Sequence, residues 1–151
     1  MLNPDYRDML LQLNEEKAEY LIVGAYALAA HGLPRATGDI DLWIRPVAEN
    51  AEKVWKAIIK FGAPLINLTK EDLATPGIIF QIGVIPRRID IITSIDGVTF
   101  DEAWTERKQL EIEGLTVSVI GRNHLLINKQ STGRKKDLAD VLWLTSSDDN
   151  T

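Results

Sequence analysis

Cysteine is absent from the 151 residues, and so is any long apolar run. The lack of cysteine excludes disulfide scaffolds, zinc sites built on thiolates and cysteine nucleophiles. The longest apolar stretch, Tyr20 to Ala30, is shorter than the ~20 residues that a membrane-spanning helix needs. The first residues also lack the basic and then apolar pattern of a signal peptide. We therefore expect a cytoplasmic protein with no membrane segment.

Basic residues are fewer than acidic ones, with 17 Lys and Arg against 22 Asp and Glu, which gives a net charge of −5. This balance argues against a protein that coats nucleic acid through its phosphates. The 45% hydrophobic and 26% charged fractions are ordinary for a globular chain. The length suits one domain, which we expect over residues 1–151, with a polar frayed end at 146–151.

Helical and strand patterns alternate along the chain. Apolar residues recur at helical spacing after Pro4, and a longer amphipathic helix runs from Ala51 to Gly62. Further helices are predicted at 25–31, 122–130 and 135–144, and Thr69 with Asp72 resembles a capping pair for a short helical turn before Pro76. Strands are predicted at 20–23, 39–45, 78–82, 88–95, 110–113 and 115–120. Asp96-Gly97 is typical of a tight turn. This order predicts an α/β (α+β) fold, in which helices, including two C-terminal ones, pack on a short mixed sheet.

Two carboxylates alternate with apolar residues in the strand that begins at Asp39. Because alternate side chains of a strand share a face, Asp39 and Asp41 point the same way. Paired carboxylates repel each other unless a cation neutralises them, and their oxygens are ligands that Mg²⁺ and Mn²⁺ prefer. The alternatives are a solvated strand face or an edge strand that uses charge to block aggregation.

A third carboxylate, Asp90, interrupts an otherwise apolar strand. Burying a carboxylate is costly unless it has a partner. If this strand lies beside the one that carries Asp39 and Asp41, all three side chains can face one cation site, as two-metal phosphoryl transfer requires. The alternative is a salt bridge from Asp90 to Arg87 or Arg88.

A glycine ends the first predicted strand and leads directly into a helical pattern. Such a turn, formed here by Gly24 and Ala25, can present backbone N–H groups to phosphate oxygens. The alternative is an ordinary turn that joins a strand to a helix.

A basic patch lies near the C-terminus and consists of Lys129, Arg134, Lys135 and Lys136. Cations near a helix start would bind a triphosphate and its leaving pyrophosphate. The alternative is a solvated loop whose charge the two following aspartates balance.

Together these residues resemble the nucleotidyltransferases of the DNA polymerase β superfamily. That family's motif is an apolar residue, Gly, then Gly or Ser, a spacer, Asp-x-Asp or Asp-x-Glu, and a third carboxylate on a later strand. The corresponding residues are Val23-Gly24-Ala25, Asp39-Ile40-Asp41 and Asp90. Ala25 departs from the pattern, because alanine keeps its backbone N–H but has no hydroxyl.

The resemblance extends to the small stand-alone, toxin-like nucleotidyltransferases of bacteria and archaea. It includes the stretches His31–Thr37, Phe80–Gly83, Ile95–Val98 and Asn128–Asp140, and it covers roughly residues 20–144. It implies a nucleotidyltransferase fold and transfer of NMP from an NTP such as ATP to an acceptor hydroxyl, with release of pyrophosphate.

The same resemblance assigns roles to individual residues. Asp39, Asp41 and Asp90 would be the catalytic ligands of two Mg²⁺ (or Mn²⁺) ions. The nucleotide and its phosphates would be bound by Gly24, Ala25, Arg35, Thr37, Lys129, Arg134 and Lys136.

Other functions remain open from the sequence. The chain fits a weakly active or inactive nucleotide- or partner-binding module, including a toxin-like component with an antitoxin-like partner. A metal-dependent nuclease fits less well. The acceptor is open between a small molecule such as an antibiotic, a tRNA end and a protein hydroxyl, and a homodimer is compatible with the small size.

Overall fold

A mixed six-stranded sheet organises the protein in the computed structural model, which describes residues 2–33 and 38–146. The strand order is β3-β4-β2-β1-β6-β5. The strands are β1 (Tyr20–Val23), β2 (Ile40–Ile44), β3 (Ile79–Ile82), β4 (Ile89–Ile92), β5 (Lys108–Ile112) and β6 (Leu115–Val119). Neighbouring strands are antiparallel except for two parallel pairs, β1 with β6 and β2 with β4.

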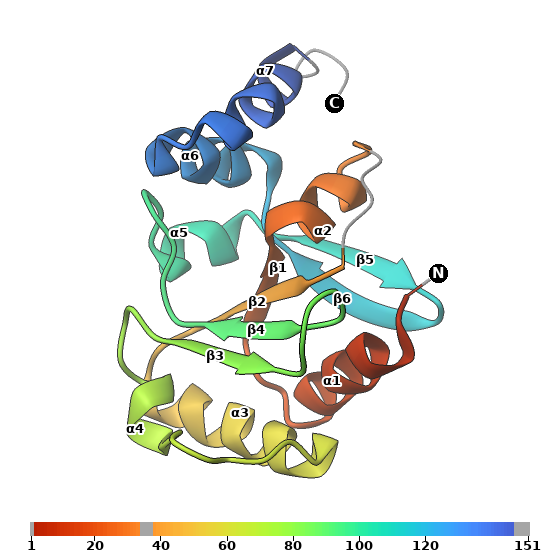
Figure 1. Cartoon of the computed structure of the whole chain (residues 1–151), viewed down its shortest axis with the longest axis vertical. Helices are drawn as coiled ribbons and strands as arrows, with labels where there is room; N and C mark the ends of the chain where they lie inside the picture. Colours follow the sequence, from red (N-terminus) through yellow and green to blue (C-terminus); the bar gives the residue numbers. More distant parts are fainter. Residues whose placement is uncertain (1, 34–37, 147–151) are drawn as a thin grey trace.

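Helices lie at both ends of the sheet in the view of Figure 1, with α3 and α4 at the bottom and α6 and α7 at the top. The helices are α1 (Pro4–Glu15), α2 (Gly24–Ala30), α3 (Ala48–Phe61), α4 (Lys70–Leu73), α5 (Phe100–Thr105), α6 (Arg122–Thr132) and α7 (Leu138–Ser146). A short 3₁₀ turn, η1 (Lys135–Asp137), leads into α7. Among the described helices, none is both long and apolar enough to cross a bilayer.

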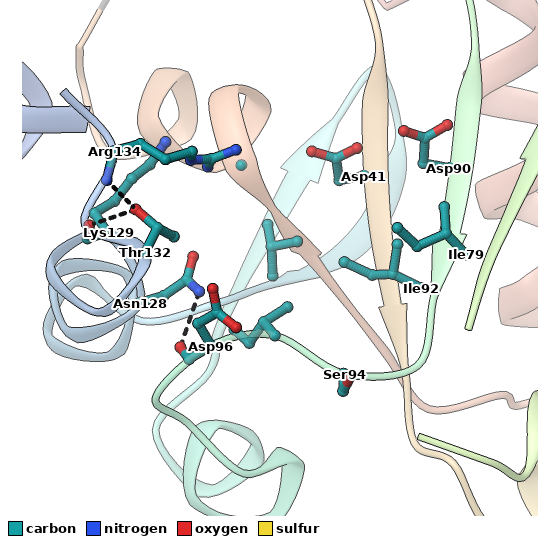
Figure 2. Close-up of a pocket in the computed structure, with 13 residues that line it drawn as sticks. Asp41, Ile79, Asp90, Ile92, Ser94, Asp96, Asn128, Lys129, Thr132 and Arg134 are labelled. Carbon is teal, nitrogen blue, oxygen red and sulfur yellow. Dashed lines mark hydrogen bonds between the residues drawn. The ribbon is translucent and has the colours of Figure 1, made fainter. Parts of the chain in front are cut away.

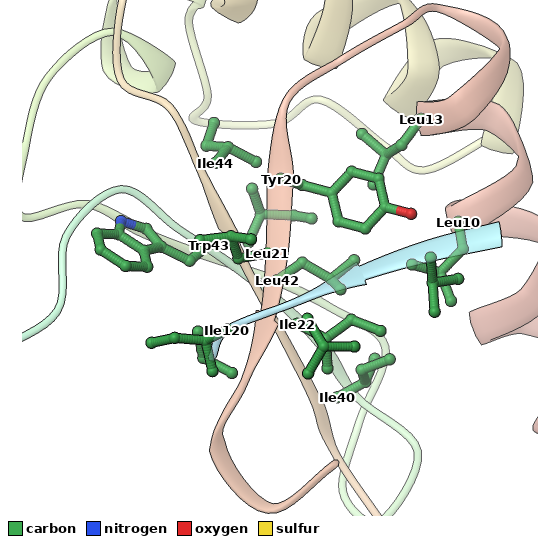
Figure 3. Close-up of a cluster of buried hydrophobic side chains, with 14 of the residues drawn as sticks. Leu10, Leu13, Tyr20, Leu21, Ile22, Ile40, Leu42, Trp43, Ile44 and Ile120 are labelled. Atoms are coloured by element: carbon green, nitrogen blue, oxygen red, sulfur yellow. The ribbon is translucent and has the colours of Figure 1, made fainter. Parts of the chain in front are cut away.

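The hydrophobic core lies between the sheet and the inward faces of α1 and α3. Figure 3 shows Leu10 and Leu13 of α1 beside side chains of β1 and β2, and both leucines are fully buried. Trp43 of β2 is 1% exposed, and its ring meets Phe100 edge to face at 5.1 Å between centroids. Burial of these large side chains is the main term that stabilises the sheet and therefore the positions of its polar residues.

The predicted α/β fold with a short mixed sheet and two C-terminal helices is confirmed. The first helix begins at Pro4 as predicted, and Asn3 caps it. The predicted strand 88–95 is shorter, because β4 ends at Ile92 and the chain then forms a turn around Gly97. The helix predicted from residue 135 begins as the 3₁₀ turn η1.

One helix, α5, is not among the predicted elements. It is only six residues long, too short for apolar periodicity to be distinct. Its start carries a capping box, in which Thr99 and Glu102 exchange side chain to backbone hydrogen bonds. That spacing of Thr and Glu is the signal in the sequence that would have located it.

Candidate active site

Two carboxylates, Asp41 and Asp90, face each other across neighbouring strands. The parallel register of β2 and β4 pairs them directly, so their Cβ atoms are roughly 5 Å apart. Both carboxylates point the same way in Figure 2. Burial of the Asp41 carboxyl, reinforced by the charge of Asp90 and a hydrogen bond to it, raises the pKa of Asp41 to about 6. The pair therefore favours any cation that neutralises it.

Asp39 lies just before β2 and is linked to Asp90 by an arginine. The Arg88 backbone N–H donates to Asp39 Oδ1 at 3.2 Å, and Arg88 Nη2 lies 3.2 Å from Asp39 Oδ2. Arg88 Nε also donates to Asp90 Oδ1 at 2.7 Å. Asp90 thus has both predicted relationships, since it lies opposite Asp41 and forms a salt bridge with Arg88.

The three aspartates do not form one compact ligand group. Within residues 2–33 and 38–146, no three His, Asp or Glu side chains lie close enough together to hold a metal ion. Asp41 and Asp90 are the opposed pair, whereas Asp39 meets Asp90 only through Arg88, which pairs with both. The oxygens of the pair suit a hard divalent cation, and Asp39 joins them only if its link to Arg88 is released.

Gly24 lies directly against the Asp41 carboxylate. Its φ is +69°, and a Cβ built on it would lie 2.4 Å from Asp41 Oδ2. Only glycine combines this backbone conformation with such a close approach. The residue that follows β1 and opens α2 therefore determines how close the carboxylate can come to the backbone of α2.

Across from the carboxylates, Lys129 of α6 is buried, with 8% of its surface exposed. Its Nζ lies 3.2 Å from Asp137 Oδ1 and 3.4 Å from Asp140 Oδ2, so it joins α6 to η1 and α7. The aspartates balance its charge, as the alternative interpretation of the basic patch proposed, but inside the protein rather than in a solvated loop.

Arg134 and Thr132 complete the interactions of Asp137. Arg134 Nε lies 2.8 Å from Asp137 Oδ2, and the Thr132 hydroxyl donates to the same oxygen at 2.6 Å. Burial alone would raise the pKa of Asp137, but these hydrogen bonds and that of Lys129 outweigh it and lower the pKa to about 2. The Arg134 side chain remains 51% exposed.

A cleft of about 360 Å³ separates the two groups, and Figure 2 shows Asp41 and Asp90 on one side and Lys129 and Arg134 on the other. Gly24 lies on its wall. An adjoining hollow of about 280 Å³ is lined by Gly24, Ala25, Asp41, Lys129, Arg134, Lys136 and Asp137. The structure thus gathers most of the predicted site residues, while Asp39 lines neither space. Arg35 and Thr37 lie outside the described residues.

The cleft has further lining residues that were not predicted from the sequence. They are Ile79, Ile92, Ser94, Ile95, Asp96, Asn128 and Thr132. Asp96 was recognised as part of a turn and of the Ile95–Val98 stretch of the resemblance, without a role in the site, and no local pattern indicates that this turn meets α6. The contact becomes visible only when the sheet and the C-terminal helices are packed together.

The similarity to known proteins lies in the fold. No protein-family model matches the chain, and no curated protein sequence matches it. A provisionally assigned nucleotidyltransferase from Thermotoga maritima superposes with a TM-score of 0.64 at 18% identity, covering 97% of this chain and 96% of its own. The lincosamide antibiotic adenylyltransferase LnuA, bound to lincomycin, superposes with a TM-score of 0.60 at 13% identity, covering 97% of this chain and 98% of its own.

A third structure, an antigenic nucleotidyltransferase-like protein from Paracoccidioides brasiliensis, gives a TM-score of 0.53 at 17% identity, with 93% of this chain and 74% of that chain covered. Identities this low establish the architecture alone. The predicted nucleotidyltransferase fold is therefore confirmed.

Proposed function

We propose that the protein transfers a nucleoside monophosphate from an NTP to an acceptor hydroxyl and releases pyrophosphate. The observation that carries the proposal is the cleft in which Asp41 and Asp90 stand opposite Arg134, with Gly24 packed on Asp41. A triphosphate needs cationic partners and close backbone approach, and this cleft offers both. The fold shared with the nucleotidyltransferases adds independent support.

Asp41 and Asp90 fit a divalent cation, because burial and then the charge of Asp90 raise the pKa of Asp41, and a bound cation would offset both effects. They would hold Mg²⁺ or Mn²⁺, with Asp39 as the further ligand. The bound metal would neutralise the phosphates and lower the pKa of the acceptor hydroxyl.

The protein's own residues position the reactants. Gly24 leaves room for the Asp41 carboxylate against the backbone at the start of α2, since a side chain there would collide with it. Arg134 and Lys136 would neutralise the charge that develops on pyrophosphate. Lys129 would keep α7 in place beside Arg134 through its two aspartates. Asp90 would receive the proton of the acceptor hydroxyl.

Incubation with an α-labelled NTP, Mg²⁺ and a panel of hydroxyl acceptors tests the proposal. We expect labelled product with equimolar pyrophosphate, and a loss of at least 100-fold in rate for Asp41→Asn and Asp90→Asn. Glu49→Gln is the control, because this glutamate on α3 is 87% exposed and lies outside the cleft. Cleavage of added nucleic acid without NMP transfer would contradict the proposal and favour a nuclease.

A further inference from the structure

A second hollow, of about 370 Å³, lies where the ends of α1 and α5 meet the hairpin of β5 and β6. It is about as large as the cleft and shares no lining residue with it. Tyr20 lines the hollow and Gly24 lines the cleft, so the two spaces lie ~13 Å apart along β1. The hollow, which we call the Arg107 hollow, is lined by Lys17, Trp104, Arg107, Gln109, Thr116 and Ser118, among others.

Arg107 is held in one orientation by aromatic rings. Its guanidinium carbon lies 3.8 Å from the centroid of the Trp104 ring, and its Nη1 donates to the Trp104 carbonyl oxygen at 2.8 Å. Trp104 in turn stacks on the buried Phe100, with 5.6 Å between the ring centroids. A guanidinium that is fixed in this way loses little conformational entropy when it binds an anion.

The charge of Arg107 has no acidic partner within the part of the chain that the structure describes. The side chain forms no ion pair there, and its Nε is buried without a hydrogen-bond acceptor. Buried donors without an acceptor are rare in folded proteins, because each one costs free energy. An oxyanion in the hollow would give this guanidinium the acceptor that the described residues do not supply.

Lys17 brings a second cation to the hollow. It follows α1 with a φ of +58°, a conformation that glycine adopts more easily than lysine. Its ammonium group also forms no ion pair with any described residue. The acidic residue on the wall, Glu19, is already paired with Arg45, with 3.1 Å between Oε1 and Nε. The hollow therefore attracts negative charge, although the net charge of the protein is −5.

One wall of the hollow consists of polar side chains on the β5–β6 hairpin. Gln109 of β5 pairs in register with Ser118 of β6, and Thr116 shares the face of Ser118 because alternate residues of a strand point the same way. None of these three side chains forms a hydrogen bond with another described residue. Their amide and hydroxyl groups suit the hydroxyl groups of a sugar.

We propose that the Arg107 hollow binds a small phosphorylated sugar, at a site separate from the cleft. A phosphomonoester carries a charge of roughly −2 at pH 7 and three acceptor oxygens, which matches two cations better than the single charge of a carboxylate does. The phosphoryl group lies between Lys17 and Arg107, and the sugar hydroxyls bond to Gln109, Thr116 and Ser118. This site goes beyond the proposed transferase activity and does not depend on it.

Titration calorimetry in EDTA, without nucleotide, tests the site with ribose 5-phosphate, ribose and inorganic phosphate as probes. We expect wild type to bind ribose 5-phosphate at least tenfold more tightly than either of the other two. Arg107→Gln should weaken the binding of ribose 5-phosphate at least tenfold. Lys108→Gln is the control, because it removes the same charge beside Gln109 but from the other face of β5, and it should leave the affinity unchanged.

Two further variants separate binding from folding and the hollow from the cleft. Lys17→Gly should also weaken ribose 5-phosphate, while its unfolding temperature stays at or above that of wild type, since glycine accepts a positive φ. Arg134→Gln, in the cleft, should leave the affinity unchanged. Weaker binding in Arg134→Gln but not in Arg107→Gln would overturn the proposal. So would inorganic phosphate that binds as tightly as ribose 5-phosphate, or no binding of ribose 5-phosphate at all.

Discussion

At the scale of single residues, Gly24 and Asp41 form a close contact on the wall of the cleft. The glycine is needed for two separate reasons, its positive φ and the 2.4 Å approach that a Cβ would make to the carboxylate. Sequence patterns predicted a glycine turn and an Asp-x-Asp strand, but not that one packs on the other. That contact depends on the antiparallel pairing of β1 with β2, which puts Val23 opposite Asp41.

Gly24→Ala tests the contact against a matched glycine. We expect it to displace the Asp41 carboxylate, destabilise the fold by about 2 kcal/mol and abolish NMP transfer. Gly114→Ala is the control, because Gly114 also has a positive φ, +82°, but nothing lies within 4 Å of its Cβ position. Gly114→Ala should lower the free energy of unfolding by only about 1 kcal/mol and leave NMP transfer intact. Denaturant unfolding and the transfer assay measure both, and equal losses for the two variants would contradict the account.

The raised pKa of Asp41 predicts a pH dependence of stability. Its ordinary pKa is 3.8 and its pKa in the fold is about 6, so the fold favours the neutral form. Metal-free protein should therefore lose stability as pH rises from about 4 to about 6, by on the order of 2 kcal/mol. Thermal unfolding in EDTA measures this.

Asp41→Asn should remove most of that pH dependence. The variant should be more stable than wild type at pH 8, and the stabilities of the two proteins should become equal near pH 3.5. Glu49→Gln should follow the wild-type curve. A wild type whose stability rises over this pH range relative to Asp41→Asn would contradict the assignment.

At the scale of elements, the ion pairs of Lys129 join α6 to η1 and α7. The basic patch was visible in the sequence, but the burial of Lys129 between Asp137 and Asp140 was not, because residues 8 and 11 positions apart meet only where the chain turns between helices. The turn at Gly133, with φ +66°, brings them together. Charge composition alone could not separate this arrangement from a solvated loop.

Lys129→Met should destabilise the protein by about 3–5 kcal/mol, because it leaves two buried carboxylates without their shared cation. Lys135→Met is the control, since Lys135 is exposed and should change stability by less than about 0.5 kcal/mol. Urea unfolding midpoints compare the two variants. Equal midpoints would mean that Lys129 contributes as a solvated surface charge only.

At the scale of the whole molecule, the sheet topology converts two distant sequence patterns into one site. The strand with Asp41 and the strand with Asp90 were each predicted from local composition, and their pairing was stated only as a condition. The intervening α3, α4 and β3 make the connection that lets β2 and β4 run parallel and in register. Local periodicity contains no information on that neighbour relation, so the fold class was predictable and the cleft was not.

The net charge of the molecule differs from the distribution of charge in the cleft. A net charge of −5 would repel a triphosphate, yet the cleft sets Arg134 and Lys129 opposite the paired carboxylates. Nucleotide binding should therefore depend on a divalent cation that reverses the sign at Asp41 and Asp90.

Calorimetric titration of a non-hydrolysable ATP analogue, with and without Mg²⁺, tests this central claim most directly. We predict binding to wild type that requires Mg²⁺, and its loss in Asp41→Asn but not in Glu49→Gln. Binding of equal strength in EDTA, unchanged by Asp41→Asn, would contradict the account.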